Sequence, residues 1–238
     1  PSELSAVSTA SFAFSATDNG AASELTYECS LDGAAFVACA SPSGYEGLED
    51  GDHTFAVRAL DAAGNVDPEA ATFTWEIDTT PPETSLDGAP GALTQETTAT
   101  FAFSANEEGS TFECALDDAA LEPCASEVAY TGLGDGLHTF VVAAIDAAGN
   151  TDGSPASRTW TIDTLPPETT IESGPTSPTN VTSATFSFAA DEDASFECSL
   201  DAAAFEACSS GLGYTALAEG DYTFRVRATD AAGNVETE

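Results

Sequence analysis

The sequence contains no lysine, and its only basic side chains are four arginines and two histidines, against 41 aspartates and glutamates in 238 residues. Without lysine the chain can form no Schiff base, no P-loop phosphate site and no Lys–Asn isopeptide crosslink. No apolar run is long enough to span a bilayer as a helix. The formal net charge of −37 repels nucleic acid and anionic membranes and suits a salty medium, divalent cations, or both. We therefore expect no nucleic-acid partner and no membrane insertion within this sequence.

A long internal repeat organises the chain. The pentapeptide DAAGN begins at Asp61, Asp146 and Asp230, and "DGDHTF", "DGLHTF" and "EGDYTF" precede it at matching distances. A period of about 84 residues is that of a whole domain, because solenoid units run about 20 to 50 residues. The sequence predicts three tandem domains, covering residues 1–80, 81–165 and 166–238.

Each repeat has the alternating pattern of β-strands. "TFTWEID", for example, buries Phe73, Trp75 and Ile77 on one face, and Gly, Pro and Asp separate the strand-like segments. About seven short strands in about 80 residues indicate a β-sandwich. The linkers "DTTPPET" (78–84) and "DTLPPET" (163–169) each contain two prolines, which make a short, stiff joint. We predict an all-β fold of three sandwiches joined end to end.

Two cysteines occur in every repeat, with nine residues between them, after an alternating strand such as "TFEC". The spacing predicts a hairpin closed by a disulfide, whereas structural zinc needs four ligands and a different spacing. Disulfides place the protein outside the cytoplasm. The predicted pairs are Cys29–Cys39, Cys114–Cys124 and Cys198–Cys208.

The ends of the sequence fall inside the repeat. The first repeat begins after the "PPET" segment that opens the other two, and the third ends before an equivalent of "TFTWEID". We expect the first domain to lack its first strand and the last domain its last strand. Two explanations compete: the sequence is a window from a longer array, or a neighbouring chain supplies the missing strands. We favour the window, because no segment here is a free, extended donor.

The repeats resemble a known class of domains. "YEGLEDGDHTFAVRALDAAGN" is similar to the corner between the fifth and sixth strands of fibronectin type III and related bacterial Ig-like domains. The whole repeat, from "FECSLD" through DAAGN to "W-x-I-D-T-x-P-P-E-T", resembles Ig-like tandem repeats of very large bacterial secreted and cell-surface adhesin-type proteins. The resemblance covers essentially the full chain. It implies an Ig-like fold and an extracellular adhesive or spacer role without enzymatic activity.

No residue pattern contradicts a non-enzymatic role. His53 and His138 occupy the same repeat position, where the third copy has Tyr222, so we interpret them as residues at the rim of a strand. No nucleophile elbow, Gly-rich phosphate loop or repeating Ser/His/Asp arrangement occurs in the sequence.

DAAGN raises the possibility of calcium sites between domains. In an Ig-like sandwich the loop after the sixth strand lies at the pole where the chain enters, close to the end of the preceding domain. Calcium binds six to eight oxygens from carboxylates, amides and carbonyls. Bacterial Ig-like adhesins with similar D-x-A-G-N signatures imply calcium-stiffened joints. The alternative is a tight turn in which glycine adopts a left-handed conformation and Asp accepts backbone N–H bonds.

The calcium hypothesis assigns ligands to each joint. At the first joint they are Asp78, Asn106, Glu107, Asp146 and Asn150, at the second Asp163, Asp191, Asp193, Asp230 and Asn234, and in the first repeat Asp61 and Asn65.

The sequence thus predicts an extracellular or cell-surface structural protein: a stalk, an adhesin shaft or a filament segment. We expect its partners to be further copies of the same module or chain, assembled head to tail without isopeptide crosslinks. The alternative is a set of ligand- or carbohydrate-binding accessory modules of a larger secreted protein.

Overall fold

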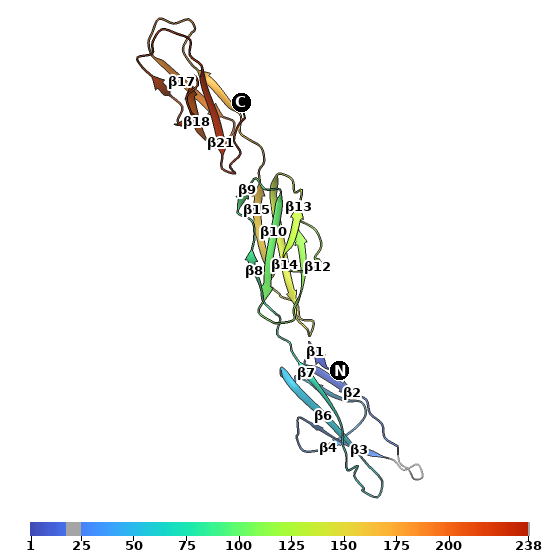
Figure 1. Ribbon diagram of the computed structural model, residues 1–238. Coiled ribbons are helices and arrows are strands. Elements are labelled where there is room, and N and C mark those ends of the chain that lie inside the picture. Colours follow the sequence, from blue (N-terminus) through green and yellow to red (C-terminus); the bar gives the residue numbers. More distant parts are fainter. Residues whose placement is uncertain (18–24, 238) are drawn as a thin grey trace.

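The computed structural model describes residues 1–17 and 25–237, and within these ranges it is all-β and contains no helix. Three groups of strands follow one another in chain order along an elongated molecule (Figure 1). Nowhere in the described ranges is there a helix of the length and apolarity that a membrane crossing requires.

The first strand group consists of a five-stranded sheet in the order β1-β7-β6-β3-β4 and a two-stranded sheet of β2 and β5. Its strands are β1 (Leu4–Ser5), β2 (Thr9–Phe12), β3 (Thr26–Leu31), β4 (Val37–Cys39), β5 (Ser43–Glu46), β6 (Gly51–Leu60) and β7 (Ala71–Ile77). The β3–β6 and β6–β7 pairs are antiparallel, whereas the short β1 runs parallel to β7.

The second group repeats this plan with one more strand. It consists of two sheets, in the strand orders β12-β11-β14-β15-β9 and β13-β10-β8. Its strands are β8 (Thr84–Gly88), β9 (Leu93–Thr94), β10 (Thr98–Ala105), β11 (Thr111–Leu116), β12 (Glu122–Cys124), β13 (Val128–Thr131), β14 (Gly136–Ile145) and β15 (Ala156–Ile162).

The third group contains the sheets β19-β18-β21 and β16-β17-β20. Its strands are β16 (Thr169–Ser173), β17 (Ala184–Ala190), β18 (Ala194–Leu200), β19 (Glu206–Cys208), β20 (Leu212–Tyr214) and β21 (Phe224–Asp230). In both the second and third groups a strand that directly follows the linker, β8 or β16, pairs with the long strand β10 or β17.

Each group has an aromatic core built from equivalent positions. Stacked phenylalanine pairs connect the two sheets, with ring centroids 4.0–4.1 Å apart: Phe12–Phe55, Phe101–Phe140 and Phe186–Phe224. Trp75 and Trp160 are 2% and 1% exposed beside the first two pairs, as the alternation predicts.

The prediction that Phe73 is buried is wrong, because this side chain is 36% exposed. It lies on β7 opposite Phe55 in the strand register, at the rim of the sandwich. The equivalent position in the second group is Arg158, whose guanidinium reaches the Pro90 carbonyl, so this site accepts a polar side chain as well.

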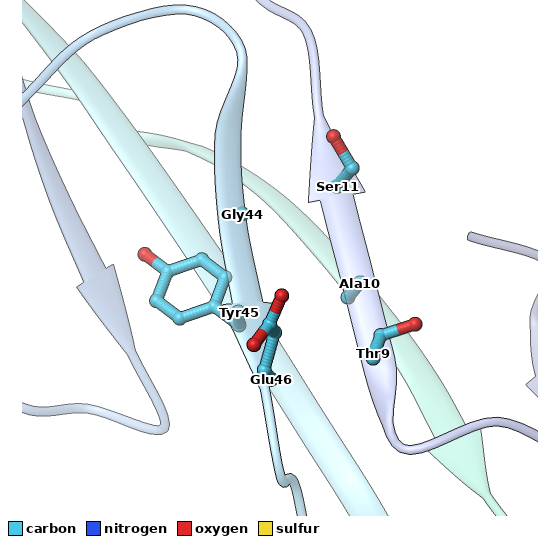
Figure 2. Close-up of a pocket in the computed structure, with 6 residues that line it drawn as sticks. All are labelled: Thr9, Ala10, Ser11, Gly44, Tyr45 and Glu46. Atoms are coloured by element: carbon cyan, nitrogen blue, oxygen red, sulfur yellow. The ribbon is translucent and has the colours of Figure 1, made fainter.

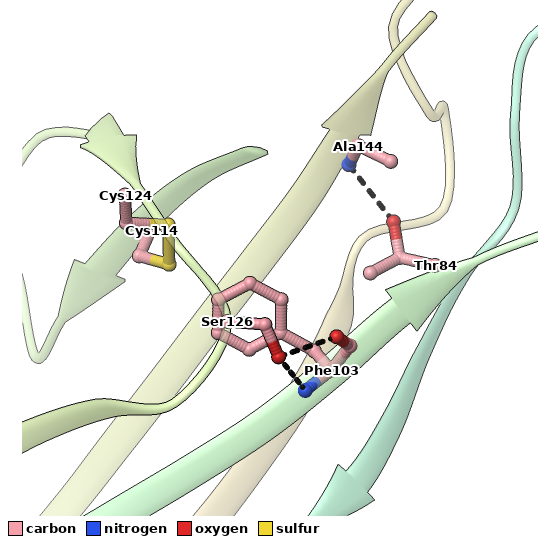
Figure 3. Close-up of a disulfide and its surroundings, with 6 residues drawn as sticks. All are labelled: Thr84, Phe103, Cys114, Cys124, Ser126 and Ala144. Atoms are coloured by element: carbon pink, nitrogen blue, oxygen red, sulfur yellow. Dashed lines mark hydrogen bonds between the residues drawn. A yellow bond between two sulfur atoms is a disulfide. The ribbon is translucent and has the colours of Figure 1, made fainter. Parts of the chain in front are cut away.

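Three disulfides have the pairing that the spacing predicts. Each joins two neighbouring strands of a hairpin at a Cα separation of 5.8 Å, within the range for disulfides. The bonds are Cys29–Cys39, Cys114–Cys124 and Cys198–Cys208, the second of which appears in Figure 3.

Candidate metal centre at the joints

The first linker, residues 78–84, is attached to the strand group that precedes it. Thr79 donates to Asp50 Oδ1 from its backbone N–H at 3.1 Å and from its hydroxyl at 2.8 Å, and the Thr80 hydroxyl donates to Asp50 Oδ2 at 3.1 Å. At the second linker, Thr164 makes the equivalent bonds to Asp135, at 3.0 Å from the N–H and 2.9 Å from the hydroxyl. One carboxylate before β6 or β14 thus holds the start of each linker.

The same linker is attached to the group that follows it. Glu83 N–H donates to Asn106 Oδ1 at 2.7 Å, and Asn106 N–H returns a bond to the Glu83 carbonyl at 3.1 Å. Thr84 N–H donates to the buried Asp152 carboxylate at 2.8 Å, and Ala144 N–H donates to the Thr84 hydroxyl at 2.9 Å (Figure 3). Since Pro82 is also fully buried, the linker has few free degrees of freedom.

The second joint repeats these contacts with different residues. Glu168 N–H donates to Asp191 Oδ1 at 2.8 Å, which is the bond that Asn106 accepts at the first joint. Thr169 N–H donates to Glu236 Oε1 at 2.9 Å, the counterpart of the bond to Asp152. Pro167 is fully buried like Pro82.

In all three copies DAAGN forms a turn in which the Asp carboxylate accepts the backbone N–H and the side-chain amide of the Asn. In the second copy the Asp146 Oδ1 atom accepts the backbone N–H groups of Gly149 and Asn150 at 2.6 and 2.8 Å, and Asn150 Nδ2 donates to Asp146 Oδ2 at 2.7 Å. Gly149 has φ +98°, in the left-handed region that side chains with a Cβ rarely adopt. This explains the Asp, the Gly and part of the role of the Asn.

The remaining role of the asparagine is to bridge the joint. Asn150 Nδ2 also donates to the Asp78 carbonyl at 2.7 Å, and Asn234 Nδ2 donates to the Asp163 carbonyl at 2.8 Å. These bonds connect a turn in one group directly to the first residue of the linker that precedes it. In the first copy the Asn65 amide bonds to Asp61 at 2.6 Å.

Carboxylates converge beside this bridge. Ligand oxygens of Asp78, Glu107 and Asp146 all lie within 4.8 Å of one another, and the same is true of Asp163, Glu192 and Asp230 at the second joint. We call each set a carboxylate trio. Because the two trios occupy equivalent places, the arrangement is a repeated property of the joint.

The charges in each trio act on one another. The pKa of the Glu107 carboxyl is raised, first by desolvation and then by the negative charges of Asp78 and Asp146. The pKa of Glu192 is raised by desolvation and by Asp163, Asp230 and two further acids in the same way. Burial alone would raise the pKa of Asp146, but the hydrogen bonds from Asn150 and the turn outweigh it and lower that pKa.

The structure brings together only part of the ligand set expected from the sequence. Asp78, Glu107 and Asp146 form the first trio, and Asp163 and Asp230 belong to the second. The amides of Asn150 and Asn234 face the trios as hydrogen-bond donors. Asn106 and Asp191 instead use a side-chain oxygen to hold the linker, and Asp193 acts on Glu192 only through its charge. Asp61 and Asn65 form the isolated turn of the first copy.

Glu192 is the residue that sequence reasoning missed. The segments "NEEG" (106–109) and "DEDA" (191–194) align so that Glu192 matches Glu107, and this is the acid that the two segments share at that place. Identity at the aligned position was the signal that could have found it.

The trios fit a divalent cation chemically. The chain has no lysine that could neutralise the trios, and three of its arginines are engaged elsewhere. Arg58 pairs with Glu28, Arg227 pairs with Glu197, and Arg158 donates to the Pro90 carbonyl. A purely oxygen donor set is what calcium and magnesium use, and calcium tolerates the more irregular geometry.

A shallow open hollow on the first strand group offers a different kind of surface. It lies along β2 and β5 and is lined by Thr9, Ala10, Ser11, Gly44, Tyr45 and Glu46 (Figure 2). Glu46 is its one ionisable carboxylate, accompanied by hydroxyl groups, so the hollow does not present the paired acid and base groups of a hydrolytic site.

No family model and no curated protein matches the sequence. Similar solved structures include fibronectin(III)-like modules of Clostridium thermocellum CbhA, with 12% identity, a TM-score of 0.40, and coverage of 67% of this chain and 87% of that chain. A 1.5-MDa bacterial ice-binding adhesin shares 14% identity at a TM-score of 0.45, covering 92% and 85%. A Ca²⁺-stabilized adhesin of an Antarctic bacterium shares 18% identity at a TM-score of 0.45, covering 98% and 68%. Because these sequence identities and TM-scores are low, the functional proposal rests on the geometry of the chain itself.

Proposed function

We propose that this chain is a non-enzymatic, extracellular structural segment: part of a stalk, an adhesin shaft or a filament built from modules at residues 1–80, 81–165 and 166–238. The observation that carries the proposal is the joint. At both linkers the chain is hydrogen-bonded to the preceding and the following strand group, and an asparagine from the following group bridges back to the linker.

Such joints suit a stiff spacer better than they suit a flexible array. A Pro-Pro linker with anchored neighbours transmits direction from one module to the next, so the array extends instead of coiling. The high negative charge keeps neighbouring arrays apart. The three disulfides favour an oxidising compartment, outside the cytoplasm. Its partners are further copies of the same module, head to tail.

Calcium at each trio is the second part of the proposal. Asp78, Glu107 and Asp146 would hold one ion, and Asp163, Glu192 and Asp230 a second, with water or carbonyl oxygens completing six to eight ligands. The ion neutralises carboxylates that otherwise repel one another, and it joins residues from the linker and from two loops of the following module. Its binding therefore favours the straight joint over any bent one.

The test compares the chain in calcium and in chelator at fixed ionic strength. Small-angle scattering measures its maximum dimension, calorimetry its melting temperature, and titration calorimetry the number of ions bound. We expect two calcium ions per chain, a longer and stiffer rod and a higher melting temperature with calcium, and weaker binding of magnesium.

Glu107→Gln sharpens this test because it has effects of opposite sign. Removing one like charge should raise the melting temperature in chelator, and the loss of a ligand should remove most of the calcium-dependent gain at the first joint. Glu108→Gln, at the exposed neighbouring residue, is the matched control and should change neither. An unchanged rod length and melting temperature on calcium removal would mean that DAAGN is only a turn with a bridge.

The structural role has its own test. Antibodies raised against the chain and viewed by immunoelectron microscopy on intact cells should label extended surface material at regular distances from the envelope. Labelling confined to the cell interior would contradict the proposed location.

A further inference from the structure

Both ring nitrogens of His53 face hydrogen-bond acceptors. Nδ1 lies 2.8 Å from Asp32 Oδ2, and Nε2 lies 2.8 Å from the Glu49 carbonyl oxygen. His138 repeats this, with Nδ1 3.0 Å from Asp117 Oδ2 and Nε2 2.9 Å from the Gly134 carbonyl. A neutral imidazole carries only one N–H, so both bonds form together only in the protonated ring.

The surroundings of each ring favour that charged form. The side chain of His53 is 11% exposed, and its ring lies 5.3 Å from the indole of Trp75, a favourable neighbour for a cation. The Glu49 carbonyl raises the pKa of His53 most, followed by the Asp32 hydrogen bond and the charges of Asp32 and Asp52, and burial opposes them. The pKa of His138 is raised in the same way by the Gly134 carbonyl and then by Asp117.

The carboxylate partner is fixed independently of the histidine. Asp32 Oδ1 accepts the Thr54 N–H at 2.8 Å, and Asp117 Oδ1 accepts the Thr139 N–H at 2.9 Å. Burial would raise the pKa of Asp32, but the Thr54 and His53 bonds outweigh it and lower that pKa. Asp32 therefore remains a charged anchor through the range in which the histidine titrates.

The other partner leads directly to the linker. Glu49 is followed by Asp50, the carboxylate that holds Thr79 and Thr80, and Gly134 is followed by Asp135, which holds Thr164. Each histidine thus fastens the loop whose next residue carries the linker anchor. The residue whose carbonyl faces the ring and the residue that holds the linker are therefore joined by one peptide bond.

We propose that His53 and His138 are proton-operated clamps on the two linkers. The imidazolium holds the loop of Asp50 or Asp135 against the sandwich and keeps the linker anchored. The neutral ring loses one of its two bonds and presents a lone pair to an acceptor, so the loop and the linker start loosen. The proposed function enters this inference only through the joints.

The third repeat provides a natural control. Tyr222 occupies the histidine position, its hydroxyl donates to the Ala218 carbonyl at 3.1 Å, and Thr223 N–H still donates to Asp201 Oδ1 at 2.7 Å. Tyrosine therefore keeps the bond to the loop through a hydroxyl group in place of an imidazole ring. His53→Tyr and His138→Tyr transfer this solution to the first two repeats.

The sign of the pH effect follows from the raised pKa. The ordinary histidine value is 6.5, so the stabilisation from the imidazolium is complete below pH 6.5 and is lost as pH rises from there through the folded-state pKa. Because the chain has only two histidines, nitrogen-15 NMR of the full chain resolves both rings, and each Tyr variant assigns one. We expect both rings to be doubly protonated at pH 6.5 and to titrate above it.

Coupling to the joint is measured by hydrogen exchange of Thr79 and Thr164 N–H, corrected for the intrinsic pH dependence. Above the histidine pKa we expect both to exchange about fivefold faster, the effect of one lost hydrogen bond. His53→Tyr should abolish the pH dependence at Thr79 and leave it at Thr164, and His138→Tyr should do the reverse. Asp32→Asn keeps an oxygen that accepts the Thr54 N–H, and it should lower the pH at which exchange of the Thr79 N–H accelerates.

Two results would overturn the clamp: histidines that titrate at or below pH 6.5, or linker amides whose exchange does not follow the ring. Running the series both in saturating calcium and in chelator separates this outcome from the calcium proposal. A flexible array with intact histidine titration would refute the stalk function alone, and a stiff array with insensitive linker amides would refute the clamp alone.

Discussion

Replacing Asn150 with alanine isolates the bridge across the first joint. The variant removes the 2.7 Å bond from Nδ2 to the Asp78 carbonyl and the 2.7 Å bond to Asp146 Oδ2. Asn65→Ala is the matched control, because its amide makes the equivalent bond to Asp61 within the turn, at 2.6 Å. The difference between the two variants therefore reports the cross-joint bond.

The expected magnitude is that of one net hydrogen bond between uncharged groups, about 1 kcal/mol. This corresponds to a change of about fivefold in the equilibrium between the closed and the open joint. The bridge ends on the linker, so the loss should appear in hydrogen exchange of Glu83 and Thr84 N–H, which bond to Asn106 and Asp152. Glu168 and Thr169, at the second joint, provide an internal reference.

We expect Asn150→Ala to accelerate exchange of Glu83 and Thr84 about fivefold and Asn65→Ala to leave them unchanged. Equal acceleration of the Asn65 and Asn150 backbone N–H groups, each in its own variant, with no response at Glu83 and Thr84, would show that the asparagine acts through the turn alone. Acceleration of less than about twofold in Asn150→Ala would show that the direct contact does not hold the joint closed.

Further predictions concern the stability of the second strand group and the contributions of its disulfide and of Asp152 to the free energy of unfolding. Replacing both Cys114 and Cys124 with alanine opens an 11-residue loop and should lower the unfolding free energy by about 2.8 kcal/mol in the chain-entropy model. Trp160 fluorescence in a Trp75→Phe background measures this loss. The same change at Cys29 and Cys39 should leave the Trp160 unfolding transition unchanged. Asp152→Ala leaves the Thr84 N–H without its buried acceptor and should cost about 1–3 kcal/mol by the same fluorescence assay, whereas Asp152→Asn should cost less. The pKa of Asp152 is lowered: burial opposes this, but hydrogen bonds from Thr84 and Ser154 outweigh it. Its contribution is therefore present above the ordinary value of 3.8 and lost as pH falls below it, which an acid titration of the wild type against Asp152→Asn should show.

Much of the fold follows from local patterns in the sequence. Strand alternation places Trp75 and Trp160 in the core, and equal cysteine spacing in three copies fixes the disulfide pairs. Phe73 escapes this logic, because alternation assigns a face of the sheet but not the distance from its rim.

The joints are less predictable, because their contacts combine residues some 70 positions apart. The poles of an Ig-like sandwich predict Asp78 and Asp146 as neighbours, but they cannot predict that Asn106 turns its oxygen toward the Glu83 N–H or that Glu107 points to the trio. Those choices depend on the backbone path of one short loop. The histidine contacts were also not predictable: Tyr222 at the third position suggested only a residue at the rim of a strand, whereas the structure shows that both residue types bond to the carbonyl four positions earlier.

The hairpin disulfides also determine what happens when the chain is pulled from its two ends. Tension along the molecule passes from β7 through the linker to β8, and the β6–β7 hydrogen bonds resist it by shear along their strands. The cysteine pairs lie away from this path, in the β3–β4 and β11–β12 hairpins, and their positions are 10 residues apart. A module that yields would still keep that loop folded back, which shortens its released length by roughly 30 Å at about 3.4 Å per residue. The disulfides therefore act as extension limiters, and a chain treated with reductant should lengthen further under force at each unfolding step.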